Sequence, residues 1–105
     1  MMAGTIRPLS DAELRIEVIG PTGSPVADAV VEADVYNPNG SKVAAAVPFT
    51  VLGAGKYALP VQAAWSDENA EVPTGRALLG EYLAQVKLVY AATQQVQQIR
   101  YYVKF

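Results

Sequence analysis

Apolar and polar residues alternate through most of this chain, in short segments separated by Gly, Pro and Asn. Between residues 13 and 19, the apolar side chains of Leu14, Ile16 and Val18 occupy every second position, with charged residues between them. A period of two places the apolar side chains on one face of a β-strand, whereas a helix requires a period of 3.6 residues. The same pattern predicts further strands in residues 29–36, 42–52, 57–61, 81–91 and 95–105.

Residues that favour turns separate these segments. The sequence of residues 20–25 is Gly-Pro-Thr-Gly-Ser-Pro and that of residues 37–40 is Asn-Pro-Asn-Gly, and both favour chain reversal. Pro48 divides residues 42–52 because it lacks a backbone N–H, which predicts a sheet edge or a bulge. Six or seven short strands without a convincing helix predict one all-β domain, an antiparallel β-sandwich. In its last strand, alternation directs four side chains to the core: Ile99, Tyr101, Val103 and Phe105.

The first twelve residues lack a usable period, and Pro8 interrupts them. We therefore predict an N-terminal arm at residues 1–12 and a sandwich domain at residues 13–105. Ile6 and Leu9 are apolar side chains that a solvated tail does not need. Ordering each residue costs about 1–2 kcal/mol, so we expect the arm to bury these side chains on a neighbouring subunit.

Residues 63–80 fit no strand, and connections of this length are usually functional or disordered. The segment contains the only Trp of the chain, an acidic half and an apolar half. In one interpretation Trp65 and Leu78 or Leu79 close an open end of the sandwich, because large apolar residues are usually buried. In a second interpretation the loop contacts a partner, because Trp and Arg are enriched at interface hot spots.

The acidic half of this loop allows a third interpretation, which is calcium binding by Asp67, Glu68, Asn69 and Glu71. Carboxylate and amide oxygens are the ligands that calcium prefers. However, the regular ligand spacing of a calcium-binding loop is missing from the segment. We therefore predict no metal site.

Composition excludes most catalytic chemistry. The chain has no Cys and no His, which removes the common nucleophile pairs and thiolate metal sites. Ser41 and Lys42 are adjacent, and on a strand their side chains point to opposite faces. The carboxylates of the predicted strands fall on outward faces. We predict that the protein is not an enzyme and uses no cofactor or small-molecule substrate.

Charge and hydropathy limit the partners. The formal net charge is -2 and the basic residues are dispersed, so no basic stripe predicts a nucleic-acid partner. No apolar run approaches the 18 residues or so that span a bilayer, and no segment predicts a membrane-surface role. The N-terminal residues do not resemble a signal peptide, so we expect the protein either to stay in the cytosol where it is made or to leave it by a route that the sequence does not encode.

Three local patterns resemble the immunoglobulin-like domains of bacteria and phages. Residues 23–40, GSPVADAVVEADVYNPNG, resemble a segment in which Gly-x-Pro-Val-x-x-Ala precedes a strand and a Pro-Asn-Gly turn follows it. Residues 55–57, GKY, and residues 80–88, GEYLAQVKL, resemble the starts of later strands in those domains. The resemblance implies an immunoglobulin-like β-sandwich, and it specifies the fold better than the function.

Such domains occur in bacterial adhesins and in the virions of tailed phages. Adhesin modules are usually exported in long arrays, whereas phage structural proteins assemble in the host cytoplasm without an export signal. The resemblance therefore implies a non-enzymatic virion protein, either a head decoration or a head–tail or tail component. Its expected partners are other virion proteins and copies of itself.

We expect the partner contacts to involve the arm and the long loop, through Ile6, Pro8, Leu9, Trp65, Arg76, Leu78 and Leu79. An alternative is a carbohydrate- or ligand-binding sandwich that uses Trp65, Tyr36 and Tyr102 as an aromatic surface. Strand addition at a sheet edge ranks last, because Pro48 and Pro60 make poor templates for a new strand.

Overall fold

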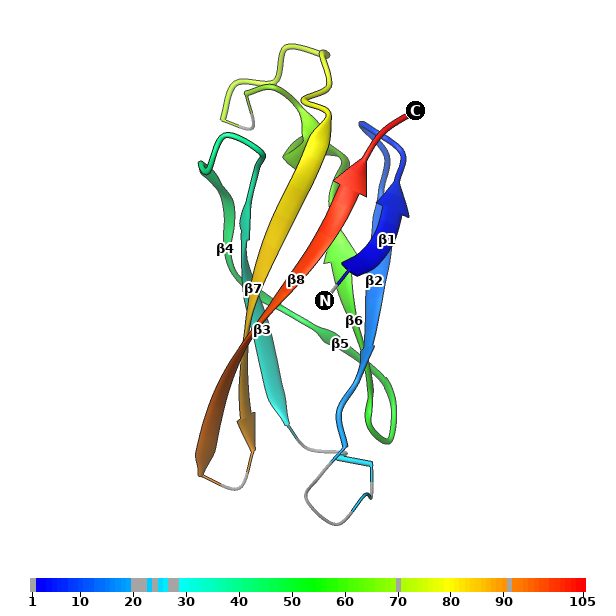
Figure 1. Ribbon diagram of the computed structural model, residues 1–105, viewed down its shortest axis with the longest axis vertical. Helices are drawn as coiled ribbons and strands as arrows, with labels where there is room; N and C mark the ends of the chain where they lie inside the picture. Colours follow the sequence, from blue (N-terminus) through cyan, green and yellow to red (C-terminus); the bar gives the residue numbers. More distant parts are fainter. Residues whose placement is uncertain (1, 20–22, 24, 27–28, 70, 91) are drawn as a thin grey trace.

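The computed structural model describes residues 2–19, 23, 25, 26, 29–69, 71–90 and 92–105. In this part of the chain the strands are β1 (Met2–Ile6), β2 (Ala12–Glu17), β3 (Val30–Tyr36), β4 (Lys42–Pro48), β5 (Thr50–Gly53), β6 (Lys56–Val61), β7 (Gly80–Tyr90) and β8 (Thr93–Val103). They form a five-stranded sheet in the order β1-β8-β7-β3-β4 and a three-stranded sheet in the order β2-β6-β5. The two sheets pack face to face along the long axis of the molecule (Figure 1). The predicted all-β sandwich is confirmed.

One 3-10 turn, η1 (Ala63–Ser66), follows β6. Among the described residues, no helix combines the length and apolar character needed to cross a membrane.

The core follows the predicted alternation. Val31, Ala33 and Val35 of β3 are buried and face inward from the five-stranded sheet. Leu14 and Leu59 do the same from the opposite sheet, where β2 and β6 pair in antiparallel register. The remaining large buried side chains of the core cluster include Tyr57, Tyr82, Val86, Ile99, Tyr101 and Val103. Period-two burial is therefore the physical reason that these segments form two facing sheets.

The predicted turn at residues 37–40 is confirmed. The Asn37 side-chain oxygen accepts the backbone N–H groups of Asn39 and Ser41, and Gly40 has a φ of 82°. Glycine adopts that φ without a steric cost, so Gly40 favours the turn of the β3–β4 hairpin at this position. Of the turn predicted at residues 20–25, only Gly23 and Pro25 lie within the described residues.

Pro48 lies where the chain changes sheets. It is the last residue of β4, an edge strand of the five-stranded sheet, and Phe49 then leads the chain to β5 of the other sheet. The Phe49 ring is buried, and its N–H donates to the carbonyl of Val31 at 2.9 Å. The prediction of an edge at Pro48 is confirmed. Pro60, in contrast, lies in β6, the central strand of its sheet, where it faces Glu13 beyond the end of β5.

The prediction of an arm at residues 1–12 is wrong. Met2–Ile6 forms β1, which pairs in parallel with β8, and β2 already begins at Ala12. Ile6 is buried in the core of the same chain, and its carbonyl accepts the N–H of Lys104 at 3.2 Å. Figure 1 shows β1 lying beside the upper half of β8. The apolar residue that we assigned to a neighbour therefore belongs to this domain.

The end of the chain also differs from the prediction. β8 ends at Val103, and the Phe105 side chain is 89% exposed rather than directed inward. Alternation places Phe105 on the inner side of a strand, but no strand continues that far. The residue lies at the end of the sandwich that carries the loop between η1 and β7 (Figure 1).

Candidate functional site

Ser66 brings together the two segments that were expected to contact partners. Its hydroxyl accepts the N–H of Leu9 at 2.6 Å, and its carbonyl accepts the N–H of Leu78 at 2.8 Å. Asp11 adds a second hydrogen bond between the N-terminal segment and the long loop, because its carboxylate accepts the N–H of Ala63 at 2.8 Å. Residues 7–11, the loop of residues 62–79 and residues 104–105 thus meet at one end of the sandwich, which we call the loop end.

Asp67 organises the long loop from within. Its side chain is only 2% exposed, and its carboxylate accepts the N–H groups of Asn69, Thr74 and Gly75 at 2.8–3.1 Å. The Thr74 hydroxyl donates to the same carboxylate at 3.2 Å. A bridge between Asp67 and Ala77 closes the loop. A buried charge that accepts several hydrogen bonds fixes the backbone around it, so the loop is a folded element.

These hydrogen bonds weaken the calcium interpretation. The Asn69 side-chain oxygen accepts the N–H groups of Glu71 and Val72, so Asp67 and Asn69 both use their oxygens on the loop backbone. Glu68 and Glu71 are exposed. Within the described residues, no three acidic, His or Cys side chains gather into a group that could hold a metal ion.

The hydrogen bonds from Asn69, Thr74 and Gly75 hold the pKa of Asp67 below its ordinary value of 3.8. The folded state therefore binds the proton less tightly than the unfolded state, and the charge stabilises the fold above the ordinary pKa. We expect this contribution to be lost as the pH falls below 3.8 and through the folded-state pKa. Thermal unfolding against pH measures it, and Asp67→Asn should lower the midpoint at neutral pH and flatten its decline in acid.

Glu71→Gln, at an exposed carboxylate of the same loop, is the matched control and should behave like the wild-type protein. An Asp67→Asn variant with the wild-type profile at every pH would show that the carboxylate does not hold the loop.

Tyr82 anchors the loop where β7 begins. Its hydroxyl donates to the carbonyl of Leu78 at 2.7 Å, and its ring stacks on Tyr101 with the ring centroids 5.4 Å apart. Burial, and secondarily the negative charge of Asp67, raises the pKa of Tyr82 to about 12. A Tyr near the start of this strand that bonds back to the preceding corner is a recurrent feature of immunoglobulin-like sandwiches.

Trp65 is part of the core. Its side chain is 5% exposed and belongs to the core cluster, as expected if this residue closes one end of the sandwich. Leu78 is half-buried, whereas Leu79 is 43% exposed. Of the residues expected to contact partners, Ile6 and Trp65 are therefore packed inside the domain. The others lie wholly or partly at the surface of the loop end: Pro8, Leu9, Arg76, Leu78 and Leu79.

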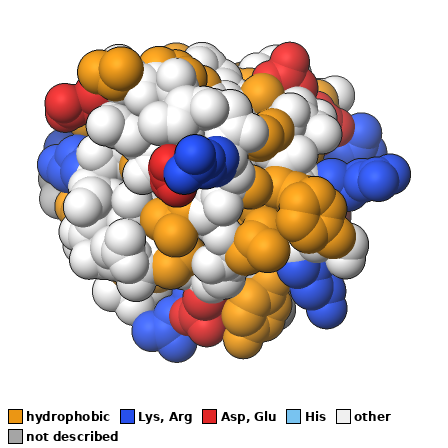
Figure 2. Space-filling model, turned by 90° about the horizontal axis from the view of Figure 1, so that it is seen from above, with side chains coloured by type: hydrophobic (Ala, Val, Ile, Leu, Met, Phe, Trp, Pro, Cys, Tyr) orange, Lys and Arg blue, Asp and Glu red, His pale blue; other side chains and the backbone are white. Residues whose placement is uncertain are grey.

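Three apolar side chains at the loop end are exposed, namely Leu9, Leu79 and Phe105, and we call them together the loop-end patch. The strands beside these residues are joined, because the N–H of Lys104 donates to the carbonyl of Ile6 in β1 and Gly80 faces Val103 across the β7–β8 pair. Figure 2 views this end and shows apolar side chains gathered over one side of it, with charged side chains around them. Contiguous apolar surface rimmed by polar groups is typical of interaction sites.

Sequence reasoning missed Phe105 as a member of this patch. Alternation places it on the inner side of the last strand, and nothing in the sequence indicates that β8 ends at Val103. Ser66 was missed as well, and nothing in a serine of an irregular segment indicates that it bonds to a residue 57 positions away.

The aromatic residues of the carbohydrate interpretation do not meet. Trp65 is buried, and Tyr36 of β3 and Tyr102 of β8 lie in strands separated by β7. Lys42 also lies over the Tyr36 ring, with its ammonium 5.7 Å from the ring centroid. The described surface therefore offers no shared aromatic platform from these three residues.

The chain matches no protein-family model and no curated protein. Among solved structures it is similar to a family 123 glycoside hydrolase from Clostridium perfringens, studied for glycolipid glycan hydrolysis. The TM-score is 0.52 with 10% identity, over 96% of this chain and 22% of that one. The chain thus spans about a fifth of that hydrolase. It also resembles a chain of the titin M10–obscurin-like 1 Ig complex, with 21% identity over 98% of this chain and 85% of that chain, and a TM-score of 0.44.

The strand order, the two facing sheets and the Tyr82 corner define the class of the protein. It is an all-β, immunoglobulin-like β-sandwich domain.

Proposed function

We propose that this protein is a non-enzymatic interaction module that binds other proteins through its loop end. The observation that carries the proposal is the loop-end patch, in which Leu9, Leu79 and Phe105 expose apolar surface. Hydrogen bonds to Ser66 and Asp67 hold the surrounding loop in one shape before any partner arrives. A pre-ordered surface loses little conformational entropy on binding, so its apolar area contributes more directly to affinity.

The setting that we propose is the virion of a tailed phage, as a head decoration or a head–tail or tail component assembled in the host cytoplasm. Support comes from the immunoglobulin-like sandwich and from the sequence patterns of residues 23–40, 55–57 and 80–88. Its partners would be other virion proteins, and no cofactor, nucleic acid, membrane or small-molecule substrate enters the proposal.

The test is a double variant, Leu79→Ser with Phe105→Ser, expressed while virions assemble. Interface hot spots cost about 2 kcal/mol or more when truncated, so we expect incorporation to fall by roughly 30-fold. Mass spectrometry of purified particles measures the incorporated protein. Because Phe105 is 89% exposed and Leu79 is 43% exposed, the double variant should unfold at nearly the wild-type temperature.

Val51→Ser is the matched control, since Val51 is an exposed apolar residue of β5 in the other sheet. Equal incorporation of the wild-type protein and the double variant would reject the loop end as the contact surface. Absence of the wild-type protein from particles would reject the virion setting.

A further inference from the structure

The edge of the five-stranded sheet at β8 is only partly covered. β1 pairs with β8 from Arg100 to Val103, at the end near the C-terminus. At the opposite end, residues 93–97 pair with β7 on one side, and no strand of the described chain lies along their other side. All five side chains in this stretch are exposed, including Val96 at 54%.

The other sheet edges carry features that discourage strand addition. β2 presents the charged residues Glu13, Arg15 and Glu17, and β4 carries Lys42, ends in Pro48 and pairs irregularly with β3. β5 has four residues, and β1 has five with a shift in its register. Residues 93–97 read Thr-Gln-Gln-Val-Gln, without a charge, a Pro or a Gly. Among the described strands, this stretch is therefore the edge without such protection.

Alternation of the β8 backbone shows which groups point to this edge. The N–H of Lys104 donates to Ile6 of β1, so the backbone groups at position 104 face the side of β8 away from β7. Because backbone groups alternate along a strand, those of Gln94 and Val96 face the same side. The backbone groups of Thr93, Gln95 and Gln97 face β7. The open edge thus offers two residues in the spacing that an antiparallel partner strand requires.

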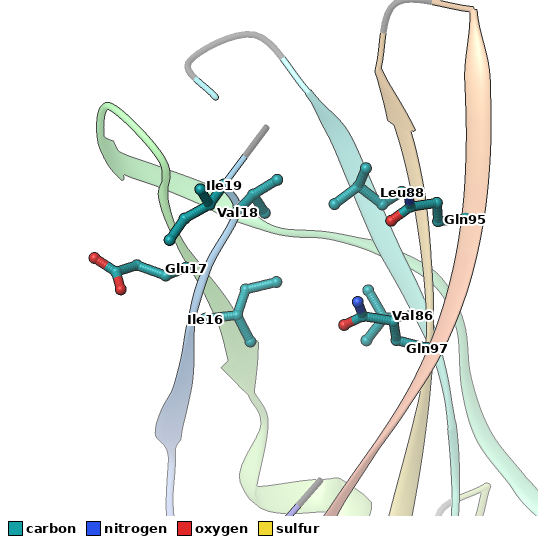
Figure 3. A pocket seen from close by; sticks show the side chains of 8 residues that line it. All are labelled: Ile16, Glu17, Val18, Ile19, Val86, Leu88, Gln95 and Gln97. Atoms are coloured by element: carbon teal, nitrogen blue, oxygen red, sulfur yellow. The ribbon is translucent and has the colours of Figure 1, made fainter. Parts of the chain in front are cut away.

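A cavity of about 220 Å³ opens between the two sheets beside this edge. Figure 3 shows the side chains of Ile16 and Val18 facing those of β7 and β8 across the opening, with Glu17 and Ile19 directed away. Its lining is apolar on the β2 and β7 sides: Ile16, Val18, Ile19, Val86 and Leu88. Gln95 and Gln97 line it from β8. These two positions continue the inward row of Ile99, yet they are polar.

We propose that residues 93–97 pair antiparallel with the same segment of a second copy of this chain, around a two-fold axis at Gln95. In this register Gln94 lies opposite Val96 of the partner subunit, and the two contribute the main-chain hydrogen bonds of the contact. Gln95 meets Gln95 of the partner subunit at the mouth of the cavity. Two glutamine amides are mutually complementary, because each has both donors and an acceptor.

Three features favour a second copy of this chain as the partner that pairs with residues 93–97. A two-fold contact matches a surface with itself, and no like charges meet here because the stretch is neutral. Thr93 of the partner subunit lies opposite Gln97, so the partner's β7–β8 hairpin ends before Arg100. It therefore does not collide with β1, whose pairing with β8 begins at Arg100. The glutamines at inward positions gain partners in the same arrangement. A contact of five residues per copy is small, so we expect a weak dimer that forms between micromolar and millimolar concentration.

Charge exchange at the axis tests this contact. Gln95→Lys places two like charges opposite each other, and so does Gln95→Glu, so each variant alone should dimerise roughly tenfold less than the wild-type protein. An equimolar mixture of the two variants should recover dimers, because Lys then faces Glu. Sedimentation over a range of concentrations measures the association. Thr50→Lys, the same added charge on exposed β5, is the control and should dimerise like the wild-type protein.

Amide hydrogen exchange gives a second measurement. Raising the protein concentration should slow exchange at Gln94 and Val96, whereas exchange at Gln95 and Gln97 should not change, since β7 already protects these two. A wild-type protein that stays monomeric at millimolar concentration would overturn the proposal. So would variants that dimerise normally, or a mixture without recovery. The protein could also stay monomeric and show slower exchange at Gln94 and Val96 only when an extended peptide is added. That outcome would overturn the dimer and identify a strand of another protein as the partner of this edge.

This contact uses the hairpin end of the sandwich, away from the loop-end patch (Figure 1). It is independent of the proposed function, and the Gln95 variants and the Leu79 and Phe105 variants can fail separately.

Discussion

Replacement of Trp65 by alanine is expected to lower the free energy of unfolding by about 3–5 kcal/mol. The indole is 5% exposed and packs into the core cluster, so its removal leaves a cavity that the surrounding sheets fill only in part. Domains of this size have a total stability of about 5–15 kcal/mol, so the loss is a large fraction of it. Urea unfolding followed by far-ultraviolet circular dichroism measures the change, because the variant lacks the only Trp of the chain.

Val72→Ala is the matched control for Trp65→Ala. Val72 belongs to the same loop and is 68% exposed, so its truncation should change stability by less than about 0.5 kcal/mol. If Trp65→Ala costs no more than this control, the indole does not close the sandwich. The interpretation of Trp65 as a partner contact would then return.

Trp65 shows how far the sequence predicts the candidate site. Large apolar side chains are usually buried, and this rule correctly predicts that the Trp65 side chain packs inside the domain. They do not predict how the loop around it folds, because Asp67 holds the backbone of Thr74, seven positions away. Hydrogen bonds between a side chain and a distant backbone depend on a chain path that no local pattern records. The residues of the loop end were therefore predictable in type, and their arrangement was not.

The strands divide in a similar way. Val31, Ala33 and Val35 are predictable because a strand with one buried face must alternate. β1 does not follow this rule because it is a short parallel edge strand, which is held by its backbone pairing with β8 and by the buried side chain of Ile6. The prediction that Phe105 points inward fails for another reason. Alternation assigns a side chain to one side of a strand, but it does not indicate where strand pairing ends. Open edges also follow from topology, so the unprotected edge of β8 required the structure.

Deletion of residues 1–7 gives the second large effect that we expect. The truncated domain loses the buried side chain of Ile6 and the whole pairing of β1 with β8, and it uncovers Tyr101 and Val103 beside them. Loss of a buried Ile side chain alone costs about 2–5 kcal/mol, so the free energy of unfolding should fall by more than about 3 kcal/mol. Urea unfolding followed by Trp65 fluorescence measures it, since the truncation leaves that ring in place.

Two point variants separate the core contribution of β1 from a nonspecific effect of truncation. Ile6→Ala should reproduce most of the loss, because it removes the buried side chain and keeps the backbone pairing with β8. Arg7→Ala, at the exposed neighbouring position, should change stability by less than about 0.5 kcal/mol. A detachable arm predicts the reverse, namely a truncated domain as stable as the whole chain. That result would place residues 2–6 outside the sandwich and free them for a neighbouring subunit. The expected loss instead identifies them as a structural strand of this domain, whose transfer to a partner would strongly destabilise the sandwich.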